Sequence, residues 1–417
     1  MSSFGRKLNP LRSLREPRGI KGIRQSVVIT NNPSTIDQNQ QLLVRFPNLG
    51  SEDVVVPGSV RLAFKITLES ESDADRTLVD NIGRAIVRKT TIRISGNEIM
   101  SIDDSDVFYT YCDFWWTIQQ RVNAVYQGID ISTNRNVTKL RIDAGNKSES
   151  DVEDMAVARA FGNRFCIPLD FELLESHMPF YQSALGDRLE YELTFNSYNK
   201  VIQSTDAEAS YMIEGISLEF EKVTHPELAR QISSHYSGRL AVLYDRVLRH
   251  RKIPLDKADT LWNINLNVPA KSMKGILLLF DNYYNPKITK VEITIEGVPN
   301  QLFSQGMRTY QQWDEIKKFF GCQKRDPEVD KVSKGLDLAA ITIGKYFTNR
   351  YALWLDMRTT DDNSLHGSGR RIENASEGIT IQITKQSESA GALNAYVFII
   401  MDAQLNIEDG RFVEAVY

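Results

Sequence analysis

The sequence of 417 residues has little cysteine, little histidine and no long apolar run. Its three cysteines, Cys112, Cys166 and Cys322, lie far apart without a Cys-x-x-Cys pair, which argues against a disulfide framework and indicates a reducing compartment. The longest apolar runs, 276–280 and 395–401, have the length of strands and are too short to span a bilayer. The five histidines have no partners at the spacing of a zinc motif. We therefore predict no metal, no cofactor and no membrane-spanning helix.

Positive charge is not in excess either. The chain has 50 Lys and Arg against 54 Asp and Glu, a net charge of −4, which argues against a protein whose whole surface condenses nucleic acid. The N-terminus lacks the apolar core of a signal peptide, and Ser2 stands where N-myristoylation needs glycine. We expect a protein that is synthesised in the cytoplasm without a signal peptide and carries no lipid anchor.

One stretch of the sequence occurs twice, at residues 78–96 and again at 279–297. Seven identical pairs in this stretch lie 201 positions apart with no gap, among them Asn81 with Asn282 and Gly96 with Gly297, and two more, Tyr109 with Tyr310 and Asp113 with Asp314, continue the register. In both copies a segment of alternating apolar and polar residues, typical of a half-buried strand, leads into the glycine. A repeat of this length corresponds to one domain. We interpret the chain as two similar β-domains in tandem.

The first 25 residues differ in composition from the rest of the chain. Seven cations stand among glycine and proline, against the single acid Glu16. Such a segment cannot bury enough apolar surface to fold alone, so residues 1–25 are predicted to form an extended arm. The arm either serves solubility alone or binds a neighbouring subunit, an anionic membrane face or nucleic acid. Its cations are Arg6, Lys7, Arg12, Arg15, Arg18, Lys21 and Arg24.

The first domain, residues 26–224, alternates short β-rich runs with turn residues, which indicates antiparallel strands with one buried face. One helix is predicted at 103–125, with Trp115 on its apolar stripe, followed by an exposed excursion at 127–163. Its strands are predicted at 42–46, 60–68, 84–95, 164–169, 188–195 and 211–223.

The second domain, residues 225–417, begins with a short helix at 225–233 and has a second helix at 310–320. Because each half has seven or eight strands and a helix, we predict an all-β fold of two tandem eight-stranded antiparallel jelly-roll barrels with short helices in their loops. The strands of this half are predicted at 240–247, 261–268, 275–280, 288–296, 351–357, 378–384 and 392–405.

No enzyme motif in the sequence is complete. Gly344-Lys345 resembles the end of a phosphate-binding loop, but Ala339 and Tyr346 occupy positions where that motif needs other residues. The Gly-rich stretch 356–371 offers carboxylates, an imidazole and hydroxyls, yet neighbours on one loop rarely hold a nucleophile and a base at ~3 Å. We interpret this stretch as a strand followed by a turn, with an arginine that pairs with an acid. No catalytic residue is predicted, and the protein is not expected to be an enzyme.

The second half resembles the double jelly-roll major capsid proteins of the lineage that includes adenovirus hexons, large DNA viruses, virophages and Polinton-type elements. Residues 218–251 are similar to the segment that joins the two barrels of that family, and residues 266–276 (LNVPAKSMKGI) to its N-x-P-x-K motif. Residues 293–310 resemble a strand, turn and aromatic of the family, and 355–369 resemble its Polinton and virophage-like members. The likeness covers roughly residues 60–417. The chain lacks the family's proline-rich closing motif, so 392–405 is predicted as the last strand.

This resemblance implies a structural protein that forms a homotrimer, in which three chains supply six barrels to a pseudo-hexameric capsomer of an icosahedral shell. It implies neighbouring capsomers and minor capsid or penton proteins as partners, and the virion as location. Residues 127–163 and 359–376 would be surface or intersubunit loops. The basic arm would lie on the inner face, linking capsomers or meeting an inner membrane or the genome.

Other functions remain open at this stage. A minor capsid or vertex protein is one of them, although such proteins usually carry one jelly roll. A tandem carbohydrate-binding module is another, with Trp262, Trp354 or tyrosines as sugar platforms. A cupin-type enzyme would need clustered His and Glu ligands, which the sequence does not show.

Overall fold

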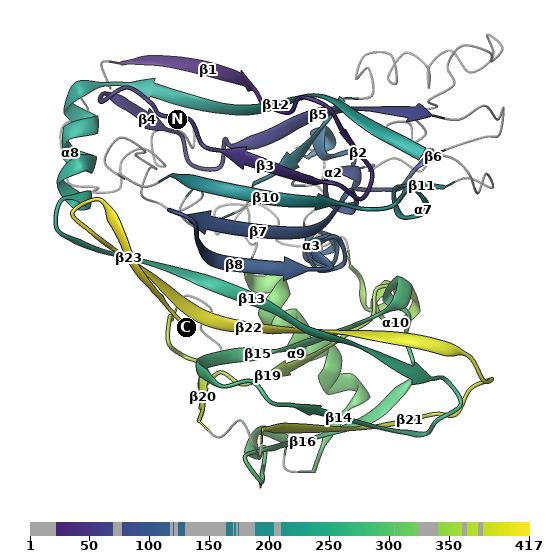
Figure 1. Ribbon diagram of the computed structural model, residues 1–417. Coiled ribbons are helices and arrows are strands. Elements are labelled where there is room, and N and C mark those ends of the chain that lie inside the picture. Colours follow the sequence, from purple (N-terminus) through teal and green to yellow (C-terminus); the bar gives the residue numbers. More distant parts are fainter. Residues whose placement is uncertain are drawn as a thin grey trace, which may run out of the picture. The chain divides into compact units, whose positions relative to one another are not determined.

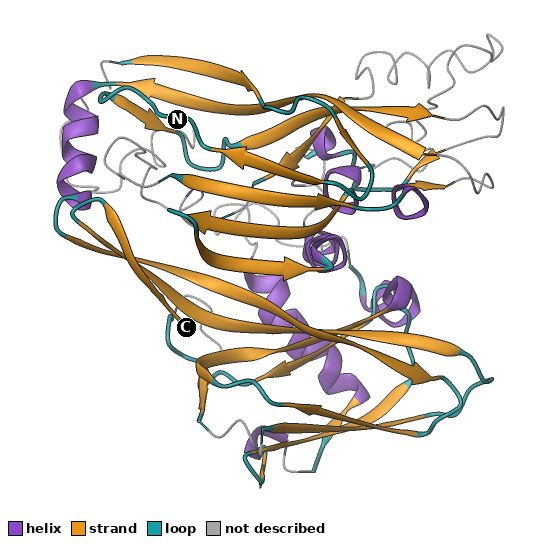
Figure 2. Cartoon of the chain, viewed as in Figure 1, coloured by secondary structure: helices purple, strands orange, loops and turns teal. Residues whose placement is uncertain are grey.

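The computed structural model describes residues 22–69, 77–116, 120, 124–129, 164–169, 171, 174, 188–203, 210–303, 305–323, 341–360, 365–373 and 378–417. Antiparallel sheets dominate it (Figures 1 and 2). The chain divides into two compact units. Unit 1 consists of Met1–Asp106, Gln119–Tyr244 and Gln404–Val416, and unit 2 of Val107–Ile118, Asp245–Ala403 and Tyr417.

The first jelly roll has two sheets, each built on a path of four strands. One path has the order β1-β12-β5-β9 and the other the order β3-β10-β7-β8. The alternation in β10 buries Leu189, Tyr191 and Leu193, while Glu190 and Glu192 point outward and form ion pairs with Arg45 and Arg93 of the neighbouring strands. The strands are β1 Ile23–Thr30, β3 Gln41–Arg45, β5 Arg61–Glu69, β7 Val87–Ile94, β8 Asn97–Asp103, β9 Arg164–Pro168, β10 Leu189–Phe195 and β12 Ser210–Thr224.

The second jelly roll repeats this plan with the paths β13-β22-β15-β19 and β14-β21-β16-β17. Its core is apolar, with residues 276–280 of β15 fully buried against the other sheet elements. The strands are β13 Arg239–Asp256, β14 Leu261–Leu266, β15 Ala270–Phe280, β16 Ile288–Ile295, β17 Val298–Pro299, β19 Ala352–Asp356, β21 Ile379–Lys385 and β22 Ala392–Glu408.

Smaller elements lie at the sheet ends and in the loops. The short strands are β2 Ile36–Asp37, β4 Asp53–Val55, β6 Thr77–Leu78, β11 Ile202–Gln203, β18 Met307–Arg308, β20 Arg370–Ile372 and β23 Arg411–Val416. The helices are α2 Ile82–Ala85, α3 Ser105–Phe114, α7 Tyr198–Val201, α8 Pro226–Tyr236, α9 Thr309–Gln323 and α10 Ile343–Asn349, with 3-10 turns η1 Val125–Gln127, η4 Asp281–Tyr283 and η5 Gln301–Phe303. No helix in the described part of the chain is long and apolar enough to cross a membrane.

The two sets of strands have the same topology. When the eight strands of each set are numbered in chain order, both give one sheet of order 1-8-3-6 and one of order 2-7-4-5. This is the strand order of a jelly roll, in which two Greek keys fold into two facing sheets. The predicted all-β fold of two tandem jelly rolls is therefore confirmed.

The sequence repeat coincides with this duplication. Strands β7 and β16 lie 201 positions apart at both ends. Asn81 and Asn282 both have left-handed backbones, with φ of 59° and 53°. The turns after the two strands also match, because Gly96 and Gly297 and the residue before each have positive φ. A two-residue hairpin turn of this type needs such angles, which explains why glycine stands at the same place in both copies.

Several sequence predictions need correction. Strand β1 begins at Ile23, inside the stretch predicted to be an arm, and residues 84–85 end helix α2 rather than begin a strand. Strand β23 follows β22, so 392–405 is not the last strand. The predicted domain boundary at 224/225 falls at the end of β12, and the two compact units divide further along the chain, between Tyr244 and Asp245. Most of the predicted excursion 127–163 lies outside the described residues.

The helix that the sequence places in the first domain belongs to the compact core of unit 2. Trp115, buried as predicted, stacks on Trp313 at 5.8 Å and on Phe320 at 6.3 Å between ring centroids. Tyr111 packs edge-on against Phe320 at 5.7 Å. Residues 107–116 therefore complete the core around helix α9, a non-local arrangement that helical spacing alone does not reveal.

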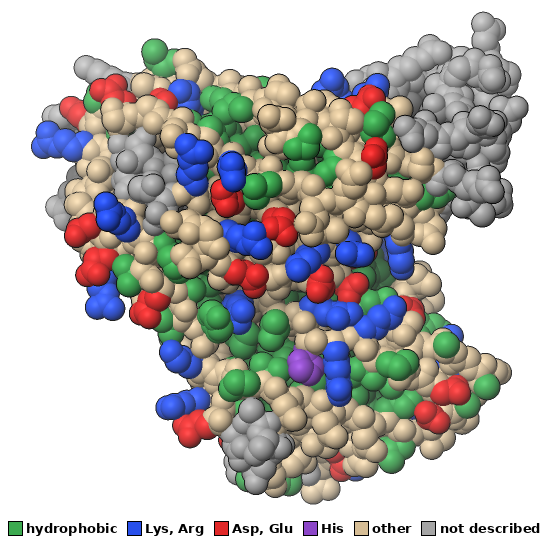
Figure 3. All heavy atoms as spheres, viewed as in Figure 1, with side chains coloured by type: hydrophobic (Ala, Val, Ile, Leu, Met, Phe, Trp, Pro, Cys, Tyr) green, Lys and Arg blue, Asp and Glu red, His purple; other side chains and the backbone are tan. Residues whose placement is uncertain are grey.

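Charged side chains of both signs are interspersed on the face that Figure 3 shows. Charged side chains of the first jelly roll form cross-strand ion pairs, such as Arg61 with Glu219 and Lys65 with Glu214. This mixed pattern agrees with the small net charge and leaves that face without a large area of a single sign.

Candidate functional site

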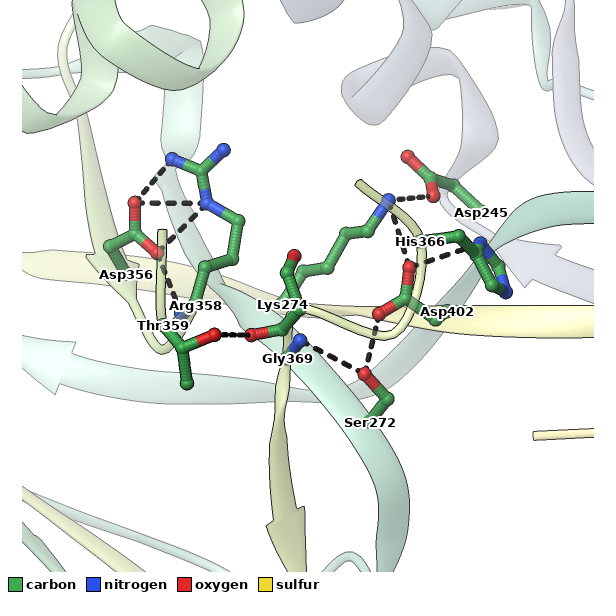
Figure 4. Close-up of polar contacts among 10 residues, drawn as sticks. Asp245, Ser272, Lys274, Asp356, Arg358, Thr359, His366, Gly369 and Asp402 are labelled. Carbon is green, nitrogen blue, oxygen red and sulfur yellow. Dashed lines mark hydrogen bonds and ion pairs between the residues drawn. The ribbon is translucent and has the colours of Figure 1, made fainter. Parts of the chain in front are cut away.

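The stretch 356–371, which carries the most chemistry in the sequence, leads from the end of β19 to β20. Residues 361–364 lie outside the described residues. The described remainder makes two groups of polar contacts in unit 2, shown in Figure 4.

The first group is a buried pair between Asp356 and Arg358. The Arg358 Nε donates to both carboxylate oxygens of Asp356, at 3.0 and 3.1 Å, and the side chains of Arg358 and Asp356 are 1 % and 4 % exposed. The Phe319 ring lies 4.9 Å from the guanidinium carbon. Here an arginine pairs with an acid, as the sequence predicted, and the flat guanidinium gains both a charge partner and an aromatic face.

The second group surrounds Lys274, which comes from the apolar strand β15. Its ammonium lies 2.5 Å from Asp245 of β13 and 3.1 Å from Asp402 of β22. The side chains of Lys274 and Asp402 are 7 % and 3 % exposed, and that of Asp245 is 35 % exposed. Burial acts to lower the pKa of Lys274, but the attraction of both carboxylates outweighs burial and raises that pKa.

Asp402 is the centre of this group. Besides Lys274, it accepts a hydrogen bond from the Ser272 hydroxyl and lies 3.2 Å from Nδ1 of His366. Burial acts to raise the pKa of Asp402, but the Ser272 hydrogen bond and the Lys274 charge lower it overall. Conversely, burial and the nearby Lys274 lower the pKa of His366 although Asp402 opposes them. The group therefore contains a lysine cation, carboxylate anions and an imidazole that the site keeps neutral at pH 7.

Further hydrogen bonds close the same loop on itself and tie it to the sheet. The Gly369 amide donates to Oγ of Ser272 at 3.0 Å. The amide and hydroxyl of Thr359 both donate to the carbonyl of Ser368, at 2.8 and 3.1 Å. A Cβ on Gly369 would lie 2.6 Å from the carbonyl carbon of Met273, so the loop approaches β15 more closely than any other residue allows.

This geometry does not support hydrolysis. In a serine hydrolase the histidine stands between the serine and the acid, so that it can take the serine proton. Here Ser272 and His366 both contact Asp402 directly, and the Ser272 hydroxyl donates to the carboxylate. The described residues also contain no group of three side chains suited to a metal ion. The arrangement holds a loop onto a sheet by buried charge.

The other candidate residues are dispersed. Of the arm cations, Arg24 alone lies among the described residues, where it sits in β1 and pairs with Glu221 of β12. Arg6, Lys7, Arg12, Arg15, Arg18 and Lys21 lie outside them. Trp262 and Trp354 are 3 % and 0 % exposed, so neither ring presents a face to a sugar. The sequence prediction missed Lys274, Asp245 and Asp402; a lysine and an aspartate inside strongly apolar strands were the available signal.

Comparison with known proteins extends the description of the fold. No protein-family model matches the chain, and no protein of curated function matches it in sequence. A solved structure of the PBCV-1 virus capsid matches with a TM-score of 0.60 at 12 % identity, over 96 % of this chain and 98 % of that chain. The chain shares the fold of this viral capsid protein. The double jelly-roll resemblance found in the sequence is thereby confirmed at the level of fold.

Two further double jelly-roll structures match along nearly their whole length. The Faustovirus major capsid protein gives a TM-score of 0.59 at 7 % identity, over 95 % of this chain and 92 % of that chain. The mavirus major capsid protein gives 0.51 at 13 % identity, over 98 % and 93 %. Because these matches cover both jelly rolls, the common feature is the tandem architecture and not a single barrel.

Proposed function

We propose that this protein is a viral major capsid protein whose homotrimers tile an icosahedral shell in the virion. The observation that carries the proposal is the identical strand order of two jelly rolls in one chain, in a fold that PBCV-1, Faustovirus and mavirus capsid proteins share. The group around Asp402 fits such a structural role, because its contacts join the loop at 366–369 to strands β15 and β22.

Symmetry gives the physical reason. Three copies around a three-fold axis would present six similar barrels, so that a trimer fills a nearly six-fold footprint and packs against six neighbours. A two-barrel chain achieves this with one kind of subunit, and its two halves are free to differ where a true six-fold would force them to be equal. The contacts between the three chains of such a trimer would be obligate and would bury large, partly apolar areas.

The basic arm is assigned to the inner face of the shell. Arg6, Lys7, Arg12, Arg15, Arg18 and Lys21 supply six cations against one acid, suited to a neighbouring capsomer, an anionic membrane or the genome. Arg24 is removed from this set because it serves β1 and its ion pair with Glu221. Minor capsid or penton proteins would be further partners at vertices.

Size-exclusion chromatography with light scattering tests the trimer, with an expected mass of three times the 47.5 kDa chain. Electron microscopy of the same fraction should show blocks with a near-hexagonal outline. A chain that stays monomeric at every concentration refutes the proposal. A variant in which the six arm cations are replaced by serine keeps the length of the arm and tests its charge. If this variant forms trimers but does not assemble into shells, the arm joins capsomers.

A further inference from the structure

Strand β1 is an edge that the rest of the described chain leaves open. It ends its sheet and pairs with β12 over eight residues without a bulge (Figure 1). Seven of its eight residues are exposed, so both of its faces meet solvent. Ile23 and Val28 are 64 % and 62 % exposed, and Ile29 is 36 % exposed. A long, regular and apolar edge strand is a template for another strand.

The direction of the backbone groups follows from one hydrogen bond. The Asn31 amide donates to the carbonyl of Ile216 in β12. Because successive residues of an antiparallel strand turn their amide and carbonyl to opposite edges, the odd-numbered residues of β1 face β12. The N–H and C=O groups of Arg24, Ser26, Val28 and Thr30 therefore point to the open edge.

The equivalent edge strand of the second jelly roll, β13, carries charges that protect it from pairing with another strand. Strand β13 also ends its sheet, but it carries Arg249, Arg251 and Lys252 within four residues. Charges of this kind prevent one edge from pairing with another. Strand β1 has no proline and a single cation, Arg24, whose charge Glu221 already balances. The two jelly rolls differ in this respect although their topology is the same.

The composition of β1 and of the arm decides which occupant fits the edge. The arm is unsuitable, because Pro10, Pro17 and its glycines leave no uninterrupted run longer than residues 11–16, which holds three charges. A second β1 fits well. In an antiparallel pair centred on Ser26, Ile23 faces Ile29 of the other copy and Arg24 faces Val28, so that exposed apolar residues meet and no like charges do.

We propose that β1 joins two copies of the chain by antiparallel pairing with β1 of a second copy, across a two-fold axis at Ser26. Hydrogen bonds from Arg24, Ser26 and Val28 of each copy would close the contact. A two-fold contact of this kind is self-complementary and distinct from the three-fold contact of a trimer. The inference rests on the proposed capsid function insofar as the paired copies belong to different trimers.

Cysteine cross-linking tests the register. In the proposed pairing Ser26 lies opposite itself at a Cα distance of about 5.5 Å, which is within the range of a disulfide. Mild oxidation of the full-length Ser26→Cys variant should give a disulfide-linked dimer on a non-reducing gel. Gln25→Cys, which would face Val27 of the other copy, is the matched control and should cross-link no more than the parent protein. Equal cross-linking of both variants, or none of Ser26→Cys, overturns the proposal.

Proline substitution tests the hydrogen bonds. Val28→Pro removes an amide that points to the open edge, and edge strands tolerate such a proline. Val28→Thr keeps the side-chain shape and the amide. Light scattering should show trimers for both, with the association of trimers weakened at least tenfold for Val28→Pro alone. Equal association overturns the β1 contact and leaves the capsid proposal intact, whereas a parent protein that forms no trimer refutes the capsid proposal.

Deleting residues 2–21 in the Ser26→Cys background separates the arm from β1. The two-fold contact predicts that cross-linking persists in the deleted protein. Loss of cross-linking on deletion would mean that the arm, and not β1, holds the two copies together, and it would overturn the pairing of β1 with itself.

Discussion

Replacing Lys274 by methionine should destabilise the second jelly roll by an amount that the surroundings of Asp402 determine. Methionine retains the apolar stem and removes the ammonium. Asp245, whose side chain is 35 % exposed, can be solvated by water after the change. Asp402, whose side chain is 3 % exposed, cannot be solvated in this way. It keeps the Ser272 hydroxyl and the neutral His366 as neighbours but loses the Lys274 ammonium.

The magnitude follows from that difference. Removing one partner of a buried ion pair costs about 3–5 kcal/mol, because the remaining charge stays buried without compensation. Since the Ser272 hydrogen bond remains, we expect Lys274→Met to lower the free energy of unfolding by about 3 kcal/mol at pH 7. The loss should shrink as the pH falls, because an unpaired Asp402 can escape the penalty by taking a proton.

Urea unfolding followed by tryptophan fluorescence measures this loss, since Trp262 and Trp354 are both buried in unit 2. Lys290→Met is the matched control in the same unit: Lys290 pairs with Glu292 at 2.7 Å, with side chains 28 % and 43 % exposed. Breaking such an exposed pair costs about 0–1 kcal/mol. Adding Asp402→Asn to Lys274→Met should restore part of the loss by removing the stranded charge.

Two results would refute the reasoning. One is a Lys274→Met protein that loses no more stability than Lys290→Met. The other is a double variant no more stable than Lys274→Met, since the cost would then not arise from the charge of Asp402.

Three further changes test the same unit. Gly275→Ala should lower the free energy of unfolding by about 1–3 kcal/mol, because its Cβ would lie 2.5 Å from the Trp354 ring; a melting temperature equal to that of the parent contradicts this. Tyr351→Phe removes the hydroxyl that donates to Oε1 of buried Gln312 and should lower the free energy of unfolding in urea by about 1–3 kcal/mol. An unchanged urea midpoint would mean that the Gln312 amide oxygen finds another donor. Because the fold lowers the pKa of His366 below its ordinary 6.5, the unfolded chain binds that proton first as the pH falls, and stability decreases from pH 6.5 down through the folded pKa. His366→Gln should flatten the dependence of stability on pH over that interval. An unaltered slope would mean that other groups cause the pH dependence.

Most strands could be predicted from the sequence because alternation reports directly which face of a strand is buried. The turns at Gly96 and Gly297 were also predictable, since positive φ restricts the choice of residue. Strand β23 was missed although a signal existed: Asp409-Gly410, with φ of 49° and 73°, is a strong hairpin turn between β22 and β23. The charged stretch 249–252 hid the second half of β13, because its side chains break the apolar alternation.

The charge group around Asp402 could not be predicted in the same way. Its members stand at positions 245, 272, 274, 366 and 402, and strand order alone brings β13, β22 and β15 side by side. The sequence indicated the loop at 366–369 but not the strands that receive it. Local patterns determine which face of an element is buried, whereas the partners across a sheet depend on topology.

The duplication separates the constraints of the fold from those of assembly. Two of the positions that both halves share, Asn81 with Asn282 and Gly96 with Gly297, have positive φ, so both barrels keep a residue there that tolerates this conformation. The edge strands β1 and β13 occupy equivalent places in the two barrels, yet one is apolar and the other is cationic. Barrel stability does not require that difference, because neither edge is paired by the described chain. In the proposed trimer the difference between β1 and β13 would serve assembly. One edge would join a neighbouring trimer and the other would repel it, so that a nearly six-fold block would bind adjacent blocks in only one orientation.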